Sequence, residues 1–198
     1  MANQGFQAAT NGWRWVKSNL NNYINSDNIY PSYWWASADS VLGAALELAK
    51  TAPASTTFQS GASTFFNDGQ FDGSGNWVKK SGSYVHQSGG EDAAIGWARY
   101  LQTLSPTDAN RAAIITQLDN YYNAVSASID TPFGTDSGNF NSGFGNNSAY
   151  STKAYIYLNL YHALAEPRML GAARDYMNWL YGANPFGASF IVGFGGVN

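Results

Sequence analysis

Residues 148–165 read SAYSTKAYIYLNLYHALA. Apolar and aromatic side chains would occupy nearly every face of a helix drawn over this stretch, from Ala154 through Tyr161. A helix that is apolar all round is typical of the buried inner layer of a protein. The stretch therefore predicts an inner helix, packed among other helices.

Helical periodicity continues on both sides of this segment. Near the N-terminus, apolar residues recur at spacings of three and four, which predicts one inward stripe on an amphipathic helix; they are Phe6, Ala9, Trp13, Val16, Leu20 and Tyr23. Further helices are predicted at about 37–50, 55–66, 91–101, 115–125 and 168–181. In the helix predicted at 37–50, the residues expected to face inward are Val41, Leu42, Ala45, Leu48 and Ala49.

Two irregular stretches, 67–90 and 129–147, separate the helices and are rich in Gly, Asn and Ser or Phe. We expect both to be loops, and long loops in compact domains often carry function. No strand-rich region and no linker is evident in the 198 residues, so the sequence predicts one all-α segment over 1–198. Helical hairpins arranged as a toroid or a solenoid fit this pattern.

Composition excludes several classes of function. Only 12% of residues are charged and the net charge is −3, which does not suit nucleic-acid binding. No apolar run is long enough for a membrane span, no signal peptide is visible at the start, and there is no cysteine. The 7 Trp, 13 Tyr and 11 Phe fit either a filled core or a sugar-binding surface, because aromatic faces suit the C–H faces of pyranose rings.

Side chains that could perform acid–base chemistry are scarce. The only glutamates are Glu47, Glu91 and Glu166, and we expect the first and last to be solvated or structural. The pair Glu91–Asp92 begins a predicted helix, where negative charge is favourable in itself. A long loop precedes the pair, so substrate or cation binding is the alternative.

The remaining polar candidates have simpler interpretations. Turn chemistry accounts for Asp130 and Asp136, which flank a Pro-Phe-Gly sequence. His162 lies on the apolar helix and is expected to be a satisfied core residue, whereas His86 lies in a loop and could reach a ligand.

The C-terminal region carries a longer pattern. Residues 179–195, WLYGANPFGASFIVGFG, resemble a segment of glycoside hydrolase family 9 cellulases. The sequence GFGNNS at 143–148 resembles the Trp-Gly-Ser-Asn-Ser element of that family, and residues 39–48 and 8–15 resemble two of its helices. The similarity thus extends over nearly the whole chain.

The resemblance implies an α/α toroid of six helical hairpins, of which this chain would form a segment, and inverting hydrolysis of β-1,4-glucan by a secreted enzyme. The family's general base lies in an Asp-Ala-Gly-Asp motif, and its general acid is a glutamate beyond a His-His-Arg motif. Neither motif occurs in residues 1–198, so no catalytic residue is assigned. We expect the chain to be truncated and inactive in isolation.

A β-glucan is the expected partner, and the substrate-binding candidates are Trp34, Trp35, Glu91, Asp92 and Phe144. No cofactor is expected. Ser40 stands where the family usually has an acidic residue, which argues against its occasional calcium site near Asp39 and Asp92. Two alternatives stay open, a non-catalytic carbohydrate-binding helical domain and another α/α-toroid enzyme such as a lyase or an epimerase. The sequence at 184–195 argues against the second.

Overall fold

The structure, a computed structural model, describes residues 2–24, 38–52, 54–55, 69–79, 90–136 and 147–193. These residues are mostly helical, which confirms the all-α prediction. The helices are α1 (Ala2–Ile24), α2 (Ala38–Thr51), α4 (Glu91–Leu101), α5 (Arg111–Ser126), α6 (Asn147–Leu164) and α7 (Pro167–Tyr181). Among them, none has the length and apolar character that a membrane crossing requires.

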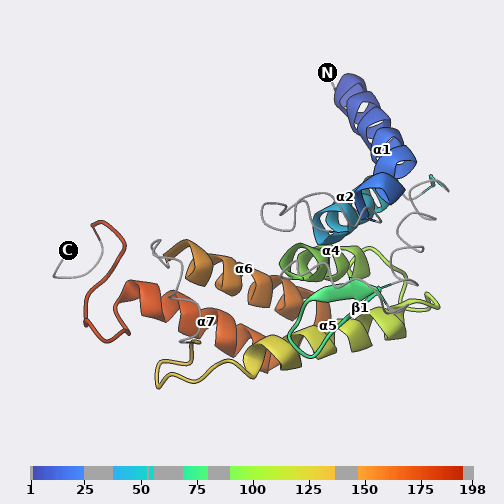
Figure 1. Ribbon diagram of the computed structural model, residues 1–198. Coiled ribbons are helices and arrows are strands. Elements are labelled where there is room, and N and C mark those ends of the chain that lie inside the picture. The colour runs from blue at the N-terminus through green and yellow to red at the C-terminus, as the bar shows by residue number, and fades with distance from the viewer. Residues whose placement is uncertain are drawn as a thin grey trace.

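The helices pack as neighbours in a layered body (Figure 1). α6 and α7 form a hairpin, α4 packs between α2 and α6, and α5 lies against α4 and α6. α1 extends away from this body beyond α2. Pro167 is the first residue of α7, where its fixed φ suits a helix start and its missing N–H costs no hydrogen bond.

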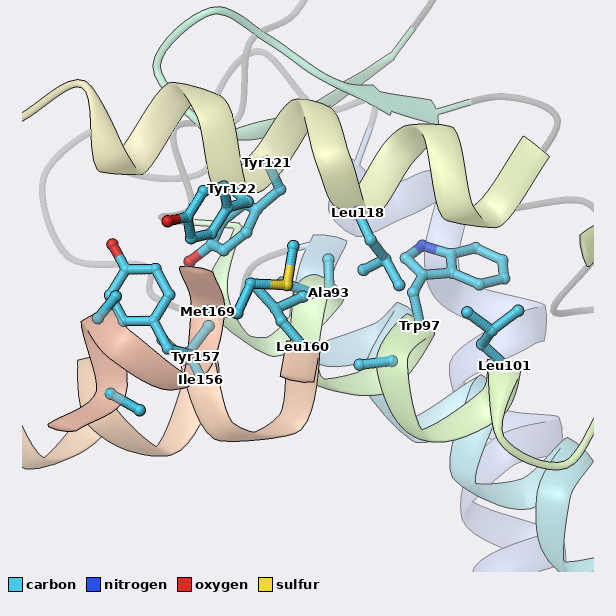
Figure 2. Close-up of a cluster of buried hydrophobic side chains, with 14 of the residues drawn as sticks. Ala93, Trp97, Leu101, Leu118, Tyr121, Tyr122, Ile156, Tyr157, Leu160 and Met169 are labelled. Carbon is cyan, nitrogen blue, oxygen red and sulfur yellow. The ribbon is translucent and has the colours of Figure 1, made fainter. Parts of the chain in front are cut away.

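The core lies where α4, α5, α6 and α7 meet. Figure 2 shows Leu118 of α5 directed toward Trp97 of α4, and Leu160 of α6 beside Met169 of α7. All four side chains are almost fully removed from solvent. Burial of each large apolar side chain contributes roughly 1.5–3 kcal/mol to folding, so this cluster holds the four helices together.

The stretch 67–90 contains a short β-hairpin, so the prediction of loop alone was wrong there. Strand β1 (Gly69–Phe71) pairs antiparallel with β2 (Trp77–Lys79), with Phe71 opposite Trp77. α5 holds the hairpin, because the Phe71 ring lies 4.9 Å from that of Tyr121 and the Phe71 N–H donates to Gln117 Oε1 at 3.0 Å. Three-residue strands give too little alternation to be recognised in a sequence.

The expected inward stripes of the first two helices are confirmed only in part. Trp13 is buried, but Phe6 and Ala9 are exposed because their half of α1 extends beyond the body. In α2, Ala49 is buried as expected, and Leu46, which was not expected to face inward, is buried as well. The other stripe residues of both helices lie outside the described side chains, except the half-buried Leu48. The helix predicted at 55–66 lies outside the described residues apart from position 55.

α6 is buried on one side only. Tyr150, Ala154, Ile156, Tyr157 and Leu160 are buried, whereas Tyr155 is 50% exposed and Leu158 is exposed too. The prediction of an inner helix buried all round is therefore wrong for this chain, since α4, α5 and α7 cover one side. His162 lies on the uncovered side and is exposed, so its prediction as a core residue was also wrong.

Candidate functional site

The acidic pair singled out in the sequence begins α4, where Glu91 is exposed. Gly90 precedes it with φ 54°, and a Cβ atom there would lie 2.0 Å from the backbone oxygen of Gly75 in the hairpin turn. Only glycine allows this approach. The close contact places Glu91 beside the hairpin. Its negative charge is also favourable at the N-terminus of α4, where the helix dipole is positive.

The structure does not describe the side chains of the other four predicted substrate-binding residues. Trp34, Trp35 and Phe144 lie outside the described residues, and Asp92 is described only as a backbone position in α4. His86 lies outside them too. The gathering of the five candidates at one site therefore stays a prediction.

A buried carboxylate lies where residues 129–136 meet α6 and α7. Asp136 is only 7% exposed, and its carboxylate forms an ion pair with Lys153 of α6. The Tyr176 hydroxyl of α7 donates to Asp136 Oδ1 at 3.1 Å and accepts from the Asp136 N–H at 3.2 Å. The Tyr150 hydroxyl donates to the Asp136 carbonyl oxygen at 3.1 Å. Asp136 thus bonds to two helices, and the interpretation of this residue as a simple turn residue was wrong.

The tyrosines around Asp136 are held in their neutral form. Burial raises the pKa of Tyr176 and of Tyr157 far above the usual 10.0. The charge of Asp136 raises both pKa values further, as do Tyr157 for Tyr176 and Tyr122 for Tyr157. A group with so high a pKa is not suited to general acid–base catalysis near neutral pH. The cluster of Asp136, Lys153, Tyr150 and Tyr176 instead anchors the 129–136 segment, whose ends pair through a bridge between Ile129 and Asp136.

Four aromatic rings run from this buried cluster to the surface, and we call them the aromatic stack. Tyr150 stacks on Trp179 with ring centroids 4.3 Å apart, and Trp179 stacks on Phe190 at 5.2 Å. Phe190 meets Phe186 at 6.0 Å with the ring planes nearly perpendicular. Tyr150 and Trp179 are buried, Phe190 is 40% exposed and Phe186 is 72% exposed.

Asn184 fixes the loop that carries the two exposed rings. Its buried side-chain amide donates to the carbonyl oxygens of Trp179 at 2.7 Å and Ala188 at 2.8 Å, and its Oδ1 accepts from the Phe186 N–H at 3.0 Å. Gly182 ends α7 with φ 122°. The resulting loop is a folded structure held by one amide side chain.

Other described carboxylates have structural partners. Glu47 forms ion pairs with Arg99 at 2.9 Å and Lys50 at 3.4 Å, which joins α2 to α4. Asp119 pairs with Arg168 at 2.7 Å, which joins α5 to α7, and exposed Glu166 lies 3.8 Å from the same guanidinium. The structural or solvated role predicted for Glu47 and Glu166 is confirmed. Over the described part of the chain, no three His, Asp or Glu side chains are grouped to hold a metal ion.

Sequence reasoning missed both the buried ion pair and the exposed stack. Asp136 and Lys153 lie 17 positions apart, and neither residue type signals burial. A signal for the stack existed, since Trp179, Phe186 and Phe190 all fall within the motif at 179–195.

Comparison with known proteins gives one family. The model of the family described as glycosyl hydrolase family 9 matches residues 1–198. No curated protein and no solved structure matches the chain.

Proposed function

This chain belongs to glycosyl hydrolase family 9, and from that premise we propose that it contributes to a catalytic domain that hydrolyses β-1,4-glucosidic bonds in cellulose or a related β-glucan. The match over residues 1–198 is the observation that carries the proposal. The aromatic-rich sequence and its low charge suit a neutral polysaccharide partner.

Inverting hydrolysis requires two carboxyl groups on opposite sides of the scissile bond. One protonates the leaving oxygen, and the other activates a water molecule, so the groups stand about 6.5–9.5 Å apart. The motifs that hold these groups in the resembling cellulases do not occur in residues 1–198. The ion pairs of Glu47, Asp119 and Asp136 also support a structural role for those carboxylates. We therefore propose that the catalytic carboxylates are supplied outside this sequence.

Within the domain, we propose that this chain binds the glucan. The residues that we expect to contact it are Trp34, Trp35, Glu91, Asp92 and Phe144. Glu91 is exposed at the first position of α4. Acid–base hydrolysis needs no cofactor. We further propose an extracellular site of action, because polymeric cellulose lies outside the cell.

Hydrolysis assays test this assignment of roles. The 198-residue chain and a longer protein that includes both carboxylate motifs are incubated with carboxymethyl cellulose and cellohexaose, and the released anomer is followed by NMR. We expect turnover with inversion by the longer protein and none by the chain. Turnover by the chain that disappears in Glu91→Gln or Asp92→Asn would make that pair catalytic and contradict the proposal.

A non-catalytic carbohydrate-binding helical domain is the second candidate. The structural engagement of Glu47, Asp119 and Asp136 favours it, since those carboxylates stabilise helix packing. The same assay separates the two candidates, because a binding domain would retain glucan without cleaving it even in the longer protein.

A further inference from the structure

The loop that follows α7 presents two aromatic rings to solvent on a fixed backbone. Phe186 and Phe190 are 72% and 40% exposed, and the next residues, Ile191 and Val192, are exposed too. Asn184 holds the backbone of this loop, and the Phe190 N–H donates to the Leu180 carbonyl oxygen at 2.9 Å. Phe190 also rests on the buried Trp179. Exposed rings that are held in place bind a ligand without paying the full entropy of ordering.

The surroundings of the two rings indicate a neutral ligand. Residues 176–198 contain no Lys, Arg, His, Asp or Glu, a run of 23 positions in a chain that has charged residues elsewhere. Residues 176–198 themselves therefore offer no basic side chain to an anionic lipid or a phosphate group. Asn178 is exposed on the last turn of α7, from which the loop begins. Its side-chain amide can donate and accept hydrogen bonds.

We propose that Phe186 and Phe190, whose ring planes are nearly perpendicular, form an aromatic platform that contacts the pyranose rings of a β-glucan, with Asn184 as its positioning residue. The proposal rests on the proposed function, and it adds a binding position in the segment after α7. A pyranose ring presents C–H groups on its faces and hydroxyl groups at its edge. Exposed aromatic faces with uncharged polar groups nearby match both parts of such a ligand.

The test measures binding by the 198-residue chain without requiring hydrolysis. Affinity electrophoresis through gels with hydroxyethyl cellulose gives a dissociation constant, and fluorescence titration with cellohexaose gives a second. We expect Phe186→Ala and Phe190→Ala each to weaken binding by roughly fivefold or more, as loss of about 1 kcal/mol of aromatic contact requires. Phe186→Tyr keeps the ring and should bind like the parent chain.

The control is Tyr155→Ala, which removes a half-exposed aromatic side chain from α6, outside the loop. It should leave glucan binding unchanged. Asn184→Asp keeps the acceptor to the Phe186 N–H but loses both N–H donors. We expect it to weaken binding as the phenylalanine variants do. Circular dichroism and the urea midpoint verify that the two Phe→Ala variants stay folded, which their exposure favours.

The outcomes separate this inference from the proposed function. Unchanged binding by both Phe→Ala variants would overturn the platform, as would equal weakening in Tyr155→Ala, which would indicate contact through any exposed apolar surface. No binding by the parent chain would overturn it as well. If the longer protein still hydrolysed β-glucan in that case, the proposed function would stand while the platform was rejected.

Discussion

Removing one partner of the buried ion pair between Asp136 and Lys153 should lower the free energy of unfolding, because this pair joins the 129–136 segment to α6. The side chains are 9% and 21% exposed. Asp136→Asn keeps the shape and the acceptor for Tyr176, but it leaves the lysine without its counter-charge. Breaking a fully buried pair costs about 3–5 kcal/mol, and since water reaches part of Lys153 we expect about 2–3 kcal/mol.

Lys153→Met should cost a similar amount, because among the described residues the carboxylate then keeps the Tyr176 hydroxyl as its side-chain partner. The double variant removes both charges together. Its loss should be close to that of one single variant, which gives a coupling free energy of about 2–3 kcal/mol. Urea unfolding followed by circular dichroism and tryptophan fluorescence measures all four proteins, and equal m-values show that the unfolded states are comparable. Additive losses, with coupling near zero, would refute the ion pair as an anchor of the 129–136 segment.

Three further outcomes follow from the structure. Gly90→Ala should lower the free energy of unfolding by at least about 2 kcal/mol, because φ is positive and a Cβ atom would overlap the Gly75 oxygen; a urea midpoint equal to that of the parent would contradict this. Stability should fall as pH rises above about 10, since the buried Tyr157 keeps its proton in the folded state while an unfolded tyrosine ionises; Tyr157→Phe should show a shallower fall in the same urea titrations. The double change Tyr155→Ser and Leu158→Ser should raise the monomer fraction in sedimentation velocity, because it removes exposed apolar surface; an unchanged fraction would mean that this face does not associate.

The positions of most helices could be predicted from the sequence because their buried faces repeat at helical spacing. In α7, Ala173, Tyr176 and Leu180 recur at helical spacing and are buried. In α5, Leu118 and Tyr122 lie four positions apart and are both buried. Periodicity reports which face of a helix can be covered, however, and not which neighbours are present to cover it. Tyr155 is therefore exposed although the pattern around it is apolar.

Polar interactions between distant segments could not be predicted in this way. Asp136 meets Tyr176 across 40 positions, and the Phe71 N–H meets Gln117 across 46. A hydrogen bond depends on a few ångströms of approach, whereas the hydrophobic pattern fixes only which side of an element faces inward. The candidate site was predictable to a smaller extent, since Glu91 does begin a helix but its role depends on residues outside the described ranges.

The loop after α7 explains why the motif at 179–195 identifies a family more firmly than it identifies an activity. Gly182 ends the helix with a positive φ, Asn184 bonds three backbone groups, and Phe190 stacks on Trp179. Each of these residues has a role in holding the loop, and none of these roles involves proton transfer. Glycosidic hydrolysis with inversion depends on two carboxyl groups, and residues 176–198 contain none. The motif therefore specifies a folded loop with exposed rings, and cleavage has to be assigned by locating the carboxyl pair in the protein that shows turnover.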